Sequence, residues 1–139
     1  MILLDTNIVS ELMRPQPDPA VLGWLDARPR HHLYLSAVTR AEIELGIALL
    51  PEGYRKQGLR AAALGIFTEF AGRFLAFEER SASRYATLVA ARIKAGTPIS
   101  VEDGQIAAVA LVAGFTVATR NTADFSGIEG LALVDPFNP

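Results

Sequence analysis

The chain has 139 residues, of which 50% are apolar and 20% are charged. This balance predicts a folded protein, and the length suits one domain, residues 1–139, with a sizeable core. The net charge of −2 indicates no general affinity for nucleic acid, so such a function needs a local basic patch. The chain has no cysteine, which excludes disulfides and thiolate metal sites, and its two adjacent histidines do not suit a zinc site.

Short apolar runs and helical apolar spacing alternate along the chain. The runs predict strands at residues 2–4, 33–35, 74–77, 115–119 and 131–134. The spacing and capping residues predict helices at 8–13, after Asp18-Pro19, and at 39–50, 54–71, 81–95 and 101–113. Residues 120–130 are expected to form a loop or a single turn. The alternation predicts an α/β fold of three layers, with a central parallel sheet of about four to five short strands between helices.

Four acidic residues follow strands or open helices. Asp5 ends the first strand, Glu42 and Asp103 lie near the starts of two helices, and Asp124 comes just after the strand at 115–119. Parallel strands share a carboxyl edge, where open α/β sheets bind ligands, so these carboxylates are expected to converge there. Converging carboxylates repel one another, and a hard divalent cation relieves that repulsion. We therefore predict an acidic metal site.

A purely structural role is an alternative for three of these acids. The pair Thr39 and Glu42 has the spacing of a capping box, and Ser100 with Asp103 resembles one. Asp124 would favour the first turn of a helix through the helix dipole alone. Capping explains the position of each acid separately, but it does not predict that the acids lie close together in space.

Four motifs occur in order along the chain. They are LDTN at residues 4–7, SxxTxAExxxG at 36–46, Asp103 opening a helix, and ATRNTADF at 118–125. This series resembles the motifs of PIN-domain proteins, and most of all the toxin ribonucleases of VapBC-type toxin–antitoxin pairs, in particular their FitB-like branch. The resemblance spans essentially the whole chain and implies a PIN-like fold.

The resemblance also implies roles for individual residues. Asp5, Glu42 and Asp103 match the three acids that bind Mg²⁺ or Mn²⁺ in the family. Some relatives have aspartate where this chain has Asn121, so either Asp124 or Asn121 fills the fourth position. The residues expected to line the site or contact substrate are Thr6, Asn7, Thr119, Arg120 and Asn121.

The implied activity is metal-dependent hydrolysis of RNA phosphodiester bonds. The arginines that we expect at the rim of the site, where RNA would approach, are Arg14, Arg28, Arg30, Arg40 and Arg120. The implied partner is a DNA-binding antitoxin that places an arginine in the acidic site. The helix at 39–50 is apolar nearly all round, which favours a homodimer, and the family suggests a dimer of toxin–antitoxin dimers.

Two other functions remain open from the sequence. A phosphatase of the haloacid-dehalogenase type would use Asp5 as its nucleophile, although Asn7 replaces its second aspartate and neither lysine, Lys56 or Lys94, is well placed. A non-enzymatic interaction module would use the acids only as helix caps. The sequence shows no signal peptide and no apolar run of membrane-spanning length, so we expect a cytoplasmic protein with no membrane partner.

Overall fold

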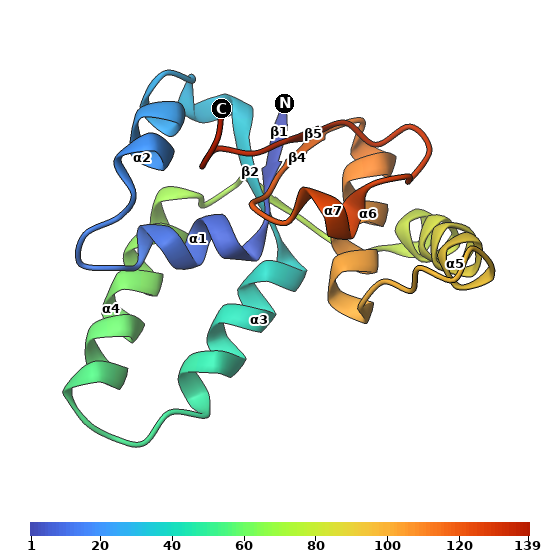
Figure 1. Ribbon diagram of the computed structural model, residues 1–139. Helices are drawn as coiled ribbons and strands as arrows, with labels where there is room; N and C mark the ends of the chain where they lie inside the picture. The colour runs from blue at the N-terminus through green and yellow to red at the C-terminus, as the bar shows by residue number, and fades with distance from the viewer.

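The computed structural model describes residues 1–139 in full (Figure 1). The strands are β1 (Ile2–Leu4), β2 (Leu33–Ser36), β3 (Phe74–Leu75), β4 (Thr116–Ala118) and β5 (Leu133–Val134). The helices are α1 (Thr6–Leu12), α2 (Pro19–Asp26), α3 (Ala37–Ala48), α4 (Tyr54–Glu69), α5 (Glu79–Lys94), α6 (Val101–Ala113) and α7 (Thr122–Phe125), with a 3-10 turn, η1 (Arg30–His32), before β2. Every predicted strand and helix is present, and the expected single turn in residues 120–130 is α7.

The five strands form one parallel sheet in the order β3-β2-β1-β4-β5. β1 is the central strand, with β2 on one side and β4 on the other. Leu3 and Leu4 of β1 are both fully buried and belong to different core clusters, because successive side chains of a strand point to opposite faces. A strand covered on both faces explains the unbroken apolar run at the start of the sequence.

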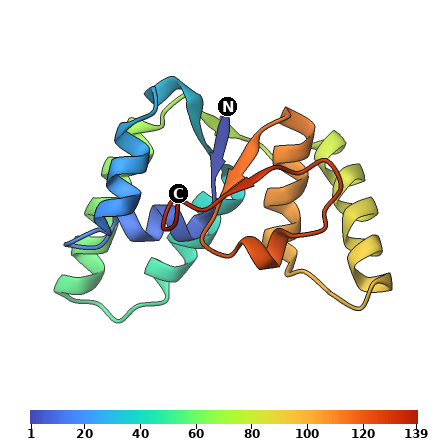
Figure 2. The same ribbon diagram turned by 45° about the horizontal axis from the view of Figure 1, so that its top comes forward.

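Helices cover both faces of the sheet, as Figure 2 shows. On the face of Leu4, helices α1 to α4 supply core residues such as Ile8, Trp24, Ile43 and Phe67. On the face of Leu3, the core comes mainly from α5, α6 and the segment that contains α7. The predicted three-layer α/β fold is therefore confirmed.

Helices α5 and α6 pack closely because α6 carries glycine at the contact. A Cβ atom added at Gly104 would lie 2.9 Å from the ring of Tyr85 and 3.0 Å from a methyl group of Val89. The neighbouring residue, Asp103, is thus held on a helix start that lies close against α5. None of the helices combines the length and the apolar character that a bilayer-spanning segment requires.

Candidate functional site

A polar hollow of about 500 Å³ lies at the carboxyl edge of the sheet, and Asp5, Glu42 and Asp103 all line it. We call it the acidic hollow. Its carboxylates come from the end of β1, from α3 and from the start of α6. Figure 1 shows that α1, α3 and α6 all begin at the same edge of the sheet. Three of the four predicted acids therefore meet, although they are far apart in the sequence.

Asp5 lies between the end of β1 and the start of α1, where neutral hydrogen-bond donors hold its carboxylate. It is the N-cap of α1, and its Oδ1 accepts a hydrogen bond from the Thr6 amide at 2.7 Å. Its Oδ2 accepts from the Thr119 hydroxyl at 2.7 Å and from the Asn7 side-chain amide at 3.2 Å. Asn7 also donates to the Thr119 hydroxyl and accepts from the Arg120 amide, so it braces the ends of β1 and β4 together.

Glu42 is held from α1 and does not cap its own helix. Ser36 is the N-cap of α3 and accepts from the Thr39 amide at 3.0 Å, which places Glu42 beyond the first turn. The capping-box alternative for Glu42 is therefore wrong. Its carboxylate instead accepts a hydrogen bond of 2.7 Å from the Thr6 hydroxyl, which also lies 3.0 Å from the hydroxyl of the fully buried Thr39.

Asp103 lies in the first turn of α6 and also lines the acidic hollow. The Ser100 hydroxyl accepts from the Asp103 amide at 3.1 Å, as a helix cap does, and the Asp103 side chain still lines the acidic hollow. Asp124 is different, because it is exposed on α7 and lies outside the lining, whereas Asn121 is part of it. Of the residues considered for the metal site, Asp5, Glu42, Asp103 and Asn121 therefore line the hollow, and Asp124 does not.

Three carboxylates of the acidic hollow, those of Asp5, Glu42 and Asp103, have raised pKa values. Burial raises the pKa of Asp5 from 3.8 to about 6, against the lowering effect of the hydrogen bonds from Thr119 and Thr6, and the charges of Asp103 and Glu42 add to the rise. Burial also raises the pKa of Glu42 and of Asp103, with Asp103 repelling Glu42 and Asp124 repelling Asp103. At neutral pH the hollow therefore holds mutually repelling negative charges.

The donor set suits a hard divalent cation that retains water. Every candidate ligand is an oxygen, which Mg²⁺ and Mn²⁺ prefer. No group of three acidic or histidine side chains is placed so that the three together could hold a metal ion. Mg²⁺ keeps several waters and uses few carboxylates, so the spread arrangement of Asp5, Glu42 and Asp103 fits such an ion.

Two of the five arginines predicted at the rim are found there. Arg14 and Arg120 line the hollow. The other three have different partners: Arg28 stacks on Trp24, Arg30 pairs with Glu69, and Arg40 pairs with Glu44. Surface arginines select partners by tertiary proximity, which the sequence does not reveal.

Three residues that the sequence did not predict also line the acidic hollow: Ser10, Glu11 and Phe137. Glu11 is only 5% exposed, pairs with Arg14 at 3.2 Å and accepts from the Asp18 amide at 2.9 Å. The spacing of Glu11 and Arg14 within one helical turn was a signal for that pair. Phe137 stacks against the Arg120 guanidinium at 4.4 Å, and nothing local in the sequence shows that the C-terminal segment returns to the site.

The lysines argue against the phosphatase. Lys56 is buried, bonded to Glu52 at 2.7 Å and to the Ala48 carbonyl, and it does not line the acidic hollow. Lys94 lies at the end of α5 and does not line it either. Asn7 has a bracing role, so the site offers neither the second aspartate nor the lysine that this chemistry needs.

Comparison with known proteins supports the family resemblance. The profile of the PIN domain family matches residues 2–131. The chain is 43% identical over 140 residues to VapC ribonuclease Y4jK of Sinorhizobium fredii, spanning 100% of this chain and 99% of that protein. It is 44% identical over 140 residues to toxin FitB of Neisseria gonorrhoeae, spanning 100% and 98%.

A solved structure, FitAB bound to an IR36 DNA fragment, contains a chain that matches this fold. The TM-score is 0.90 at 43% identity, over 99% of this chain and 96% of that chain. Together with the parallel sheet and its acidic edge, these matches define the class. The chain belongs to the PIN-domain family, and its full-length relatives there are of the VapC and FitB kind.

Proposed function

We propose that the chain is the toxin of a toxin–antitoxin pair and that it hydrolyses RNA with a divalent metal ion. The observation that carries the proposal is the acidic hollow, where Asp5, Glu42 and Asp103 come together and Asp5 is bonded only to neutral donors. Membership of a family with VapC ribonuclease and FitB toxin relatives supports the same activity. We further propose that residues 1–139 act as one domain.

The residues of the hollow would have two roles, metal binding and positioning of the metal ligands. Asp5, Glu42 and Asp103 would hold Mg²⁺ or Mn²⁺, and Asp124, or Asn121 without charge, would complete the set. A bound ion would neutralise charge at the phosphate and would lower the pKa of a bound water. Buried Thr119 and the side chains of Asn7 and Thr6 keep the carboxylates of Asp5 and Glu42 in place through the hydrogen bonds described above.

The rim supplies the attraction for RNA. Arg14 and Arg120 both line the hollow, and their charges favour the approach of a phosphate backbone to a site that is itself negative. Arg120 is held against Phe137, so its guanidinium has a defined position at the rim. Because RNA is the proposed substrate, we propose that the protein acts in the cytoplasm.

The proposed partner is an antitoxin that covers the acidic hollow. Arginine forms the best bidentate pair with a carboxylate, so a segment of the antitoxin that carries arginine would neutralise the hollow and block metal binding. The solved FitAB relative is a DNA-bound assembly, which supports a partner that binds DNA.

Self-association is proposed from apolar side chains on α3 and α4. Leu45 on α3, Leu49 at the C-cap of α3 and Leu64 on α4 are 61%, 76% and 63% exposed, and exposed apolar side chains on neighbouring helices suit a protein interface. We propose that these helices form a homodimer interface, in an assembly that would be a dimer of toxin–antitoxin dimers. Sedimentation of a monomer at micromolar concentration would contradict this.

Cleavage of RNA by the purified chain, separated from any partner, tests the activity. With Mn²⁺ present, the wild type should cut RNA, and chelation with EDTA should stop it. Mapping of the new 5′ ends in cellular RNA after brief induction would identify the target. An interaction module would neither bind Mn²⁺ nor cut RNA, and that result would refute the proposed activity.

A further inference from the structure

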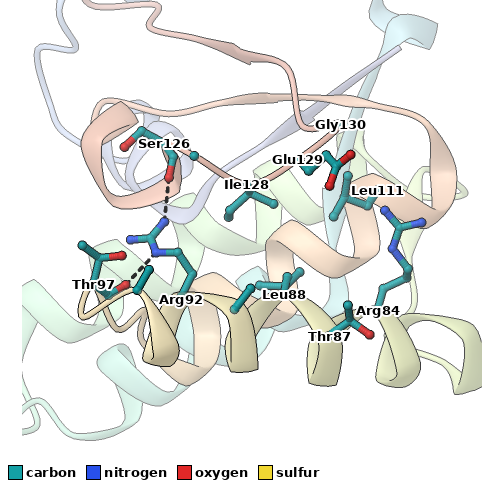
Figure 3. A pocket seen from close by; sticks show the side chains of 13 residues that line it. Arg84, Thr87, Leu88, Arg92, Thr97, Leu111, Ser126, Ile128, Glu129 and Gly130 are labelled. Atoms are coloured by element: carbon teal, nitrogen blue, oxygen red, sulfur yellow. Dashed lines mark hydrogen bonds between the residues drawn. The ribbon is translucent and has the colours of Figure 1, made fainter.

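A second hollow, a cleft of about 800 Å³, lies between α5 and the segment 126–130 that follows α7. Figure 3 shows Arg92 at the end of the cleft near Thr97 and Ser126, and Arg84 at the other end near Glu129. At the end of the cleft that holds Arg92, two segments that connect to the acidic hollow lie close to the arginine. Thr97 precedes the start of α6, and Ser126 ends α7.

Arg92 joins these two segments directly. Its Nε donates to the Thr97 carbonyl at 2.6 Å and its Nη1 donates to the Ser126 carbonyl at 2.9 Å, the two bonds drawn in Figure 3. No acidic side chain forms an ion pair with it. The guanidinium is planar and presents its donors at fixed spacing, so it sets the distance between the two carbonyls.

The Thr97 side of this bridge is fixed by the end of α5. The Thr97 amide donates back to the Arg92 carbonyl at 3.0 Å, and the Gly96 amide donates to Ile93 at 3.0 Å. Gly96 has φ of 76°, and this pattern is a Schellman helix end. Thr97 therefore moves with α5, and the segment to Ser100 and Asp103 starts from a rigid point.

The Ser126 side of the bridge fixes a short helix with few other anchors. α7 has a single turn, its N-cap Asn121 makes no side-chain capping bond, and only Phe125 is buried within it. α7 starts directly after Asn121, which lines the acidic hollow, and the amide of Asp124 on α7 donates to the Asn121 carbonyl at 3.0 Å.

We propose that Arg92 is a positioning residue that ties α7 to the segment before α6, and thereby sets where Asp124 stands relative to Asp103. The bridge explains how an exposed acid on a one-turn helix keeps a defined place beside the acidic hollow. The inference rests on the proposed metal-dependent function, because Asp124 matters there as a contributor to metal binding.

A double-mutant cycle on Mn²⁺ affinity tests this role. Calorimetric titrations would compare the wild type with Arg92→Ala, Asp124→Ala and the double variant. Arg92→Ala should weaken Mn²⁺ binding by about tenfold, the lower end of the range for residues that orient metal ligands. In the Asp124→Ala background the same change should have no further effect, because its target is already gone.

Two further variants separate positioning from general loss of structure. Arg84→Ala removes an arginine from the same helix and the same cleft, where Figure 3 draws no bond to it, and should leave Mn²⁺ affinity unchanged. Arg92→Lys keeps the charge and the apolar stem but loses the planar fork, and should weaken binding by an intermediate amount. In the metal-free protein, amide hydrogen exchange in residues 122–127 should be faster in Arg92→Ala and not in Arg84→Ala.

Several results would overturn the inference. These are an unchanged Mn²⁺ affinity in Arg92→Ala, an equal loss in both backgrounds, unchanged amide exchange in residues 122–127, or no effect of Asp124→Ala itself. If the wild type binds Mn²⁺ but does not cut RNA, the proposed activity fails and the role of Arg92 stands. A wild type that binds no Mn²⁺ contradicts both.

Discussion

Asp5 and Glu11 are two buried carboxylates that line the same hollow, one at the start of α1 and one near its end. They are 3% and 5% exposed. Glu11 has a cation, Arg14, at 3.2 Å and the Asp18 amide at 2.9 Å. Asp5 has three neutral donors and two acidic neighbours, Glu42 and Asp103.

The difference separates an acid with a structural role, Glu11, from the acid that we propose to bind metal, Asp5. The protein supplies Glu11 with its own counterion, Arg14. The Glu11 carboxylate is therefore charge-balanced within the protein, and it anchors the turn after α1. The protein brings Asp5 together with further negative charge, an arrangement that costs stability unless a cation arrives from outside. Burial alone therefore does not mark the site; the absence of a protein counterion does.

The largest expected effect is on catalysis. Asp5→Asn and Asp103→Asn should each reduce Mn²⁺-dependent RNA cleavage by more than about a hundredfold, beyond the loss typical of a residue that only orients a metal ligand. Glu42→Gln should behave likewise. Glu44→Gln is the matched control, because Glu44 lies on the same helix and pairs only with exposed Arg40. Cleavage at wild-type rates by Asp5→Asn would contradict the site assignment.

The next effect is a pH dependence of stability in the metal-free protein. The pKa of Asp5 is about 6 in the folded state and 3.8 ordinarily, so the folded state binds this proton more tightly. The free energy of unfolding should then fall as pH rises from about 4 to about 6, by up to about 3 kcal/mol from this residue. The raised pKa values of Glu42 and Asp103 act in the same direction.

Urea unfolding of wild type and Asp5→Asn, with EDTA, isolates this contribution. Subtracting the two pH profiles cancels the groups that both proteins share. The wild type should lose stability relative to the variant between pH 4 and pH 7. A difference that stays flat over this range would show that Asp5 ionises without cost.

A smaller effect of opposite sign distinguishes Glu11 from Asp5. Glu11→Gln should destabilise the protein by about 1–2 kcal/mol, because the Asp18 amide loses a charged acceptor while the exposed Arg14 loses little. Asp5→Asn at pH 8 without metal should stabilise it, since a repelled charge is removed. Chemical unfolding of both variants would measure the two changes in the free energy of unfolding. Changes of the same sign would show that Glu11 and Asp5 do not differ in this way.

The smallest effect concerns the fourth position of the site. Asp124→Ala should weaken Mn²⁺ binding a few-fold more than Asn121→Ala, because only Asp124 brings charge to the ion. The geometry makes this a demanding test, since Asn121 lines the hollow and Asp124 stands beside it. Calorimetric titration would rank the two variants, and the reverse order would assign the position to Asn121.

The sequence predicted the frame of the site well, because that frame depends on local patterns. The change from an apolar run to helical spacing predicted the position of Asp5 at the end of a strand. The capping pattern at Ser100 predicted the position of Asp103 at the start of a helix. Parallel strands then brought these acids to one edge.

The sequence could not predict contacts that depend on how distant segments approach one another. The hydrogen bond from Thr6 to Glu42 joins two helices, and the place of Asp124 depends on the path of α7, which Arg92 holds from α5. The return of Phe137 to Arg120 is of the same kind. Each is a tertiary contact with no local signature.

Titration of the metal-free protein with Mn²⁺ at neutral pH tests most directly the claim that the uncompensated carboxylates form a metal site. The wild type and Glu11→Gln should both bind the ion, because Glu11 already has its counterion within the protein. Asp5→Asn should lose most of that affinity. No binding by the wild type, or undiminished binding by Asp5→Asn, would contradict the account.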